Sequence, residues 1–427
     1  MNKVVFCLIL LIGNTAWSYE KFVLDNGFTV YLEKNNQNPL VAIQLWVNVG
    51  SADETESTNG ISHFTEHMIL KGTTNYSGEN IGNTIGKYGN HIGAWTTKKQ
   101  TFFSTEILAE GLPDVLSVFS EIAKNAVFDE NDIENEKRVV LEEYSTRKDD
   151  PMSLINSTFF SLVFPSSTYR MEEIGTVKNI NSFNRIDLLS HYEKYYTAKN
   201  MMLIVVGDIS VEDTMKLINA EYSSLKSGQK NENNSVEVNS YKHTYEEYLK
   251  KIPQTLIKIG IVVPSNEGKD YFSDKALIEI IHSGYGSRVN RELKEDLNLI
   301  SSVSAEYAKY VGMSIIFINI ECPCEYYKSV LKQVNLVFGR PITEEELDRA
   351  KEQLKTGIYI SRSSVEGIAS DIAEAITYNL PYNVEDQISM INSLNSRELG
   401  KYKSENYNKF NAVIFNPYQL RYDIPYK

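Results

Sequence analysis

Two histidines and a glutamate stand close together in the segment GISHFTEHMILKGT, residues 60–73. His63 and His67 are four residues apart, so on a helix both imidazoles project from one face and can reach a single metal ion. Glu66 lies three residues after His63, on the same flank, close enough to contact a water molecule on that ion. A single histidine on an apolar helix is usually a core residue. This chain has only six histidines, however, and the His-x-x-Glu-His order is typical of metal sites.

Two histidines leave a zinc ion short of ligands, so a third must come from elsewhere in the chain. The segment ENEKRVVLEEY, residues 134–144, predicts a helix on which Glu136 and Glu143 lie two turns apart on one face. One of them could complete a His, His, Glu set; the alternative is a solvated helix face paired with neighbouring basic residues. With the set complete, the ion would acidify a water molecule, and Glu66 would take its proton and pass it to a leaving amine. These parts suit amide hydrolysis.

The elements that must position these residues can be predicted from local patterns. KFVLDNGFTVYLEKN has the alternation of a hairpin with an Asp-Asn-Gly turn, and LVAIQLWVNVGS predicts a buried strand. A helix is expected from about Gly60, a second from Ser77, and a long charged helix over DENDIENEKRVVLEEYSTRKDD. MMLIVVGD predicts a return to strand before Gly207.

A polar segment divides the chain, and the same order of elements recurs after it. The predicted parts are a signal peptide (1–18), a zinc-bearing domain (19–226), a linker (227–238) and a second domain (239–427) without the metal motif. Strand, helix, glycine-containing turn, strands, helix and long helix follow one another in both halves, which predicts a tandem duplication.

The first 18 residues have the features of a secretory signal. Lys3 precedes an apolar run that is too short to span a bilayer, and Ala16 and Ser18 favour cleavage before Tyr19. The alternatives are an uncleaved anchor or a buried first element. No later apolar stretch has spanning length, so we expect no stable membrane span. The periplasm is the expected location, with full secretion as the second choice.

Composition excludes several other classes of protein. The chain is 42% hydrophobic and carries a net charge of −13, which disfavours nucleic acid as a partner because such binding needs a basic face. Outside the signal only Cys322 and Cys324 remain, so no disulfide framework is expected. We interpret this pair as strand-end residues rather than metal ligands.

The histidine motif and the acidic motif both resemble segments of the pitrilysin-type (inverzincin) zinc metallopeptidases. The resemblance is to the mitochondrial-processing-peptidase-like bacterial branch in particular. GISHFTEHMILKGT is similar to the family's zinc helix, G-L-A-H-F-L-E-H-M-x-F-K-G-T, and ENEKRVVLEEY to its downstream acidic helix. The resemblance implies Glu143 as the third ligand, Glu136 as an auxiliary catalytic acid, and one Zn²⁺ per chain. The implied activity is that of a zinc metalloendopeptidase.

The likeness extends from about Tyr19 to the C-terminus. GNHIGAWTTKKQTFF resembles the family's N-A-x-T strand, YYTAKNMMLIVVGD its strand ending in Val-Gly-Asp, and GYGSRVNRELKEDL its second-domain loop and helix. The implied fold is α+β: two tandem homologous α/β domains, each a mainly antiparallel sheet backed by helices, enclosing a chamber. Peptide substrates would add to an edge strand containing Gly93, Ala94 and Trp95. Trp95 is either a core aromatic residue or the wall of a substrate pocket.

Two departures from the family pattern bear on function. Gly93 stands where many members have Asn. Where members with a complete site have R-E-x-x-G-L-A-Y, whose Arg and Tyr reach the substrate, this chain has Lys294 and Ser301 in KEDLNLIS. Lysine lacks the bidentate fork of arginine, and serine lacks the reach of a phenol.

The resemblance therefore implies a homologous partner subunit that supplies the Arg and Tyr, or else a homodimer. The alternative function is a catalytically weak scaffold subunit that binds metal and peptide.

Overall fold

The computed structural model describes the greater part of the chain: residues 19–89, 91–232, 245–264, 268–282, 284–310, 313–381, 383–407 and 410–417. The predicted signal peptide, 1–18, lies outside the described residues, as does part of the predicted linker. Among the described helices, none combines the length and the apolar composition that a bilayer crossing requires.

The described strands form two sheets, with the orders β1-β2-β6-β3-β5-β4 and β7-β11-β8-β10-β9. The strands of the first sheet are β1 (Glu20–Val23), β2 (Thr29–Lys34), β3 (Leu40–Val47), β4 (Gly93–Thr96), β5 (Thr101–Leu108) and β6 (Met201–Gly207). The strands of the second are β7 (Tyr245–Lys250), β8 (Thr255–Pro264), β9 (Ser302–Tyr310), β10 (Met313–Cys322) and β11 (Asn411–Pro417). Cys322 is the last residue of β10, as its interpretation as a strand-end residue predicts, whereas Cys324 lies two residues beyond the strand; both are free cysteines.

Apart from β1, the two sheets have the same strand order. Strands β2-β6-β3-β5-β4 correspond in sequence to β7-β11-β8-β10-β9. In each sheet the first of these pairs is parallel and the others are antiparallel. The predicted fold class, two tandem α/β domains with mainly antiparallel sheets backed by helices, is confirmed.

Helices connect the strands in both halves. Those of the first half are α1 (Ile61–Ile69), α2 (Gly78–Tyr88), α3 (Leu112–Lys124), α4 (Glu130–Asp149), α5 (Pro151–Val163), α6 (Val177–Ser182), α7 (Arg185–Tyr195) and α8 (Val211–Tyr222). Those of the second are α9 (Lys269–Ile281), α10 (Tyr327–Gly339), α11 (Glu344–Ser361), α12 (Val365–Tyr378), α13 (Val384–Asn392) and α14 (Ser396–Asn406).

The chain forms two compact units, and each unit takes a segment from the other half of the sequence. The first consists of residues 1–141, 172–232 and 358–389, and the second of residues 142–171, 233–357 and 390–427. The predicted domain boundaries, at residues 226 and 239, divide the chain into two successive halves, whereas each compact unit combines segments of both halves. The boundaries stay a prediction.

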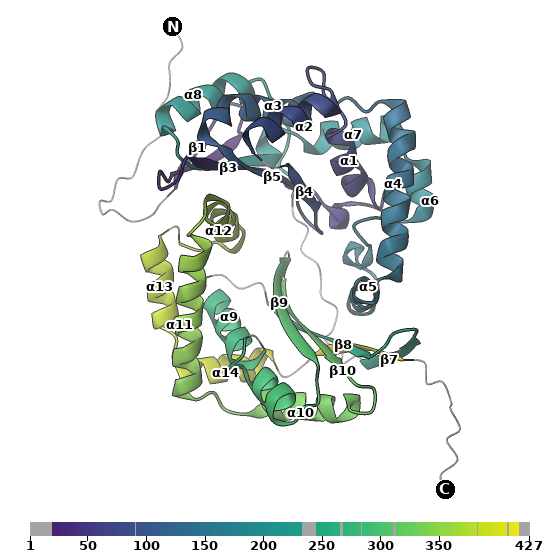
Figure 1. Ribbon diagram of the computed structural model, residues 1–427, viewed down its shortest axis with the longest axis vertical. Coiled ribbons are helices and arrows are strands. Elements are labelled where there is room, and N and C mark those ends of the chain that lie inside the picture. Colours follow the sequence, from purple (N-terminus) through teal and green to yellow (C-terminus); the bar gives the residue numbers. More distant parts are fainter. Residues whose placement is uncertain are drawn as a thin grey trace. The chain divides into compact units, whose positions relative to one another are not determined.

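In the first unit, α12 covers the sheet face opposite α3 and α8 (Figure 1). Its buried Ile368 and Ile372 belong to one apolar cluster with Ala42 of β3 and Ile204 and Val206 of β6. Burial of these side chains removes apolar surface from water, which is the main driving force for this packing. A helix from the second half of the sequence thus completes the first sheet.

In the second unit, α5 packs on β8 and β11, so a helix from the first half completes the second sheet. Phe159 lies against Gly260 of β8, where a side-chain carbon would come within 1.9 Å of the Phe159 ring. The same ring meets Phe317 of β10 edge to face, with centroids 5.3 Å apart. Gly260 is therefore required for this close approach.

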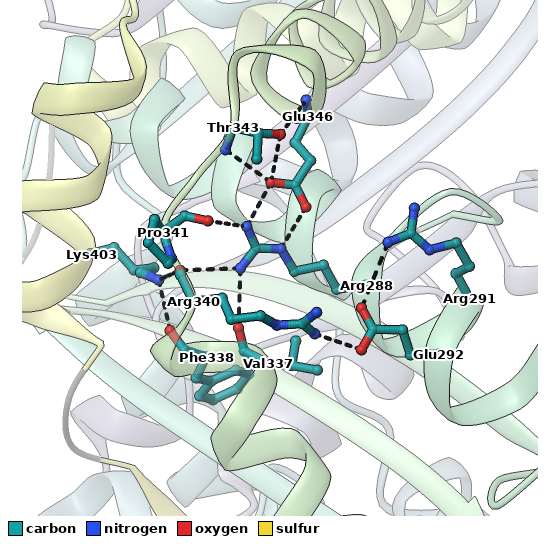
Figure 2. Close-up of polar contacts among 10 residues, drawn as sticks. All are labelled: Arg288, Arg291, Glu292, Val337, Phe338, Arg340, Pro341, Thr343, Glu346 and Lys403. Atoms are coloured by element: carbon teal, nitrogen blue, oxygen red, sulfur yellow. Dashed lines mark hydrogen bonds and ion pairs between the residues drawn. The ribbon is translucent and has the colours of Figure 1, made fainter. Parts of the chain in front are cut away.

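A buried arginine ties the turn before β9 to helix α11 in the second unit (Figure 2). Arg288 Nε and Nη2 donate to the two carboxylate oxygens of Glu346, each at 2.6 Å. Its other N–H groups reach the carbonyls of Val337, Arg340 and Pro341. Burial would raise the pKa of Glu346, but the hydrogen bonds from Arg288 and Thr343 outweigh it and lower the pKa to about 2. The pair is therefore ionised at neutral pH.

The N-terminus of α1 is held by the buried carboxylate of Glu54. Glu54 Oε2 accepts the N–H of Gly60 at 2.7 Å and the side-chain amide of Asn59 at 3.0 Å, and Oε1 accepts the N–H of Ser62 at 2.8 Å. Gly60 has a φ of 99°, a conformation that favours glycine. Burial raises the pKa of Glu54 to about 7, although the hydrogen bonds from Ser62, Gly60 and Asn59 oppose the shift. Glu54 therefore sets the start of the histidine-bearing helix.

We predict that Glu54 makes stability depend on pH. Since its pKa is higher in the folded than in the unfolded state, the stability that it contributes falls as pH rises from about 4.5 to about 7. Relative to a Glu54→Gln variant, the wild type should lose up to about 3 kcal/mol of unfolding free energy between about pH 5 and about pH 8. Urea unfolding of the metal-free proteins measures this difference. Glu79→Gln, at an exposed position of α2, is the control. An unchanged difference across this range would contradict the prediction.

Candidate metal centre

Helix α1 presents both histidines on one face, as the four-residue spacing predicts. The rings of His63 and His67 have centroids 4.6 Å apart and are tilted by 59°. His63 is buried, with 5% of its surface exposed, and His67 is half-buried. The helix packs against β4, β5 and α7, so its orientation relative to the first sheet is set by that packing.

Glu143 joins the two histidines in space. One ligand atom from each of His63, His67 and Glu143 can be chosen so that all three lie within 4.8 Å of one another. Within the described residues this is the one such group of histidine, cysteine and acidic side chains. Helix α4 is continuous from Glu130 to Asp149, so the same rigid element places Glu136 and Glu143.

Glu136 contacts His67 instead of joining this group. Its Oε1 lies 2.8 Å from His67 Nδ1, and Oε2 lies 2.6 Å from Lys71 Nζ. Burial would raise the pKa of Glu136, but the hydrogen bonds from His67 and Lys71 outweigh it and lower the pKa. An ionised Glu136 accepts the Nδ1 proton of His67, which leaves Nε2 of that ring as the metal-binding atom.

Glu66 is oriented by the edge strand. Thr96 Oγ1 of β4 donates to Glu66 Oε2 at 2.7 Å, and Glu66 is buried, with 7% of its surface exposed. Thr96 Oγ1 also lies 3.4 Å from Thr101 Oγ1 of β5. The carboxylate of Glu66 thus sits between the helix that carries the histidines and the strand that could carry a peptide.

The donor set fits zinc. Two imidazoles and a carboxylate are the ligands of many catalytic zinc sites, which keep a fourth position open. Zinc ligands lie about 3.4 Å apart at bond lengths near 2.1 Å, so small side-chain shifts bring this group onto one ion. Glu136 supplies the outer hydrogen bond that zinc-bound histidines almost always make.

Several residues that shape the site were missed by sequence reasoning. Arg147 Nη2 and Nε lie 2.6 and 3.0 Å from Glu143 Oε1, one turn further along α4. The i, i+4 spacing of these charges was the available signal. Lys71 and Thr96 had no comparable signal, because each acts on a residue from a different element. Glu54 could have been suspected as an acid close to a helix start.

Gly93, Ala94 and Trp95 lie on β4, which is the edge strand of the first sheet and, among the strands that the structure describes, pairs with β5 alone. Side chains alternate along a strand, so Thr96, which reaches Glu66, and Ala94 project to the opposite face from Trp95. Strand β4 therefore offers free backbone groups along one side, with the metal centre near one face.

The Trp95 side chain is 51% exposed, which excludes its interpretation as a core aromatic residue. Its indole stacks on Phe102 at 5.1 Å, and Phe102 stacks on Trp46 at 4.2 Å. A side-chain carbon at Gly93 would lie 2.2 Å from the indole. Glycine in place of the family's asparagine therefore leaves room for Trp95 to fold back along the strand.

Lys294 and Ser301 both lie in the second unit. Lys294 is exposed on a π-helical turn, Asn290–Asp296, and Ser301 is exposed just before β9. The Ser301 hydroxyl contacts Gln254 Oε1 at 2.7 Å and the Glu321 carbonyl at 3.1 Å. Asn298, where the family pattern has glycine, adopts a φ of 50°, which asparagine tolerates.

Comparison with known proteins agrees with the motif. Relatives include an "Uncharacterized zinc protease" of Rickettsia felis, 28% identical over 82% of this chain and 85% of its own length. The mitochondrial-processing peptidase subunit beta of Lentinula edodes is 25% identical over 86% of this chain and 84% of its own. The crystal structure of a protease from Helicobacter pylori covers 94% of this chain and 100% of its own, with a TM-score of 0.85. At 21% identity, that likeness shows the fold alone.

Two family models match successive parts of the sequence. Residues 29–172, which hold His63, Glu66, His67 and Glu143, match the model described as "Insulinase (Peptidase family M16)". Residues 182–354 match the one described as "Peptidase M16 inactive domain". Since residues 29–172 and 182–354 both match models of one family, the chain belongs to peptidase family M16, the pitrilysin-like family, whose members include relatives named zinc proteases.

Proposed function

We propose that this chain is a zinc-dependent endopeptidase that hydrolyses peptides or unfolded segments. The observation that carries the proposal is the convergence of His63, His67 and Glu143, with Glu66 on the same helix face. The family match and the names of the zinc protease relatives support it.

Each residue of the centre has a separate role in this proposal. His63, His67 and Glu143 would hold the ion, and Glu136 would keep His67 in the tautomer that binds it. When bound, zinc supplies Lewis-acid chemistry that polarises a peptide carbonyl and acidifies water. Glu66, oriented by Thr96, takes a proton from the attacking water and delivers it to the leaving amine.

We propose that the peptide binds in extended form along β4. The free edge of this strand can pair with a peptide backbone, and main-chain pairing selects little for sequence. Alternate substrate side chains would then project toward the face of Trp95, whose half-exposed indole suits an apolar or aromatic group. Substrate preference would come from that face.

We also propose that the chain works as the zinc-bearing subunit of a two-chain enzyme. Lys294 and Ser301 stand where family members with a complete site have Arg and Tyr. One relative is named as a subunit, the mitochondrial-processing peptidase subunit beta. A homologous partner could supply the missing Arg and Tyr; a homodimer is the alternative. Export to the periplasm through the N-terminal signal is part of the same proposal.

A second candidate function is a scaffold subunit that binds metal and peptide without efficient cleavage. It is favoured by the same two substitutions and by the match of residues 182–354 to a model described as an inactive domain. The complete set of His63, Glu66, His67 and Glu143 favours the enzyme, because a pure scaffold has no need of a general base.

The first test measures peptide hydrolysis by residues 19–427 and determines bound zinc. The chain is assayed alone and mixed with a homologous chain that carries Arg and Tyr at positions equivalent to Lys294 and Ser301. We expect zinc in both samples and activity only in the mixture, which a chelator abolishes and added zinc restores. Activity of the isolated chain would exclude the need for a partner. Bound zinc without activity under either condition would favour the scaffold.

Glu66→Gln should distinguish the proposed role of Glu66 as the general base from the metal-binding role of His63, His67 and Glu143. The variant keeps the three ligands and should bind zinc as the wild type does, while kcat falls by about 10²- to 10⁴-fold because the proton acceptor is lost. A quenched fluorescent peptide and elemental analysis measure the two quantities. Glu79→Gln, exposed on α2, is the matched control. Wild-type activity in Glu66→Gln would show that Glu66 is not the base.

Glu136→Gln should weaken metal binding without removing a ligand. Loss of the charge that accepts the His67 Nδ1 proton should lower zinc affinity by about 10- to 100-fold, as at other outer-shell carboxylates. Competition with a chromophoric chelator gives the dissociation constants. Glu134→Gln is the control, since Glu134 is exposed on the same helix and pairs with Lys137. Equal affinity in Glu136→Gln and wild type would refute this role.

A further inference from the structure

Lys71 belongs to the histidine motif in sequence, yet it is neither a ligand nor the base of the proposed centre. Helix α1 ends at Ile69, two residues before Lys71, and the Lys71 N–H donates to the Met68 carbonyl at 3.1 Å. A side-chain carbon at Gly78 would lie 2.7 Å from the Lys71 carbonyl oxygen, so another part of the chain approaches this backbone closely. The backbone of Lys71 is therefore held in place directly after the histidine-bearing helix.

The segment after Lys71 is joined to the start of the acidic helix. The Val127 N–H donates to the Gly72 carbonyl at 3.0 Å. Helix α4 begins three residues after Val127, at Glu130. This backbone contact holds the start of α4 near the end of α1, and Glu136 of α4 lies within reach of the Lys71 side chain.

Glu136 joins the ammonium of Lys71 to the imidazole of His67. Its Oε2 lies 2.6 Å from Lys71 Nζ and its Oε1 lies 2.8 Å from His67 Nδ1, so each carboxylate oxygen faces a different group. The Glu136 side chain is only 5% exposed, whereas that of Lys71 is 42% exposed. Lys137, the next residue on α4, pairs with Glu134. Lys71 is thus the lysine that compensates the buried Glu136 carboxylate.

An ion pair with a half-exposed lysine is usually a surface contact of small effect. This pair differs because its acid is buried, and a buried carboxylate that loses its partner keeps an uncompensated charge. Without Lys71, the Glu136 carboxylate would be free to turn toward water or another donor. The Nδ1 proton of His67 would then lose its acceptor, so the contact with Lys71 bears on the metal-binding imidazole.

We propose that Lys71 is a positioning residue of the metal centre. By holding Oε2 of Glu136, it keeps Oε1 directed at His67, and this fixes the His67 ring with Nε2 available for a metal. Nε2 lies on the far side of the ring, so repulsion between the half-exposed ammonium and a bound cation is weakened by distance and by solvent. Support of Glu136 is therefore the larger effect, and Lys71 should strengthen metal binding. The inference rests on the proposed metal centre but not on peptide cleavage.

A double-mutant cycle on zinc affinity tests this role. Competition with a chromophoric chelator gives the dissociation constants of residues 19–427 as wild type, Lys71→Met, Glu136→Gln and the double variant. Methionine keeps most of the length of the lysine stem but removes the charge. Lys71→Met should weaken zinc binding by about tenfold, the lower end of the range for outer-shell partners. In the Glu136→Gln background the same change should alter the affinity by less than about twofold, because the carboxylate through which Lys71 acts is absent.

Further variants separate positioning from general stabilisation. Lys71→Arg, which can still donate to Glu136, should retain most of the zinc affinity. Lys216→Met is the control and should leave the affinity unchanged, because Lys216 is an exposed lysine of α8 that pairs with Glu212 and Asp213. Thermal unfolding shows whether each variant is folded, and Lys71→Gln replaces Lys71→Met in the cycle if the latter is not.

The outcomes distinguish this inference from the proposed function. Weaker zinc binding by Lys71→Met only where Glu136 is present supports it, whether or not the chain cleaves peptides. Equal weakening in both backgrounds, tighter zinc binding, or wild-type affinity in folded Lys71→Met would overturn it and leave the metal centre standing. If the wild type binds no zinc, the proposed metal centre fails, and this inference fails with it.

Discussion

Each sheet of this chain has two faces to cover, and in both cases one face is covered by a helix from the opposite half of the sequence. Helix α12 packs on β3 and β6, and α5 packs on β8 and β11. The two helices occupy equivalent positions in the repeat, since each follows the long helix of its half. One face of each sheet is thus buried by a helix from the other half of the sequence, as a sheet with two apolar faces requires.

Buried polar contacts fix the position of α12 on the first sheet. Arg362, just before α12, forms an ion pair with Glu33 of β2, and both side chains are less than a tenth exposed. Glu366 Oε1 accepts hydrogen bonds from Gln44 at 3.0 Å and Ser104 at 2.8 Å. Removing one member of a buried pair leaves an uncompensated charge, so these contacts favour one seating of α12 on the sheet.

The metal centre depends on two helices whose ends are fixed. Glu54 holds the start of α1. Asp129 accepts N–H groups at the start of α4, and Asp150 does so at the start of α5, directly after α4 ends. Both helices are fixed in this way, and Glu136 and Glu143 are seven residues apart on α4. Glu143 therefore lies with the two histidines, while Glu136 contacts Nδ1 of His67. The second half repeats the strand order, but its buried Arg288 is bonded to Glu346 and to three backbone carbonyls instead of contributing to a group of metal ligands.

The sequence alone was sufficient for features that depend on local periodicity. The spacing of His63, Glu66 and His67 predicted a shared helix face, and the alternating and turn patterns predicted the first hairpin, the long acidic helix and the repeated order of elements. These signals are short-range, because helix and strand periods are properties of neighbouring residues.

Only the tertiary structure decided which distant residues meet. Sequence spacing left Glu136 and Glu143 as alternatives for the third ligand, and the packing of α4 places Glu143 with the histidines while Glu136 binds the far nitrogen of His67. The contact of Thr96 with Glu66, the fold of Trp95 over Gly93 and the exchange of α5 and α12 likewise had no local signal. Each depends on contacts between residues far apart in the chain, which form only when the sheets and helices pack together.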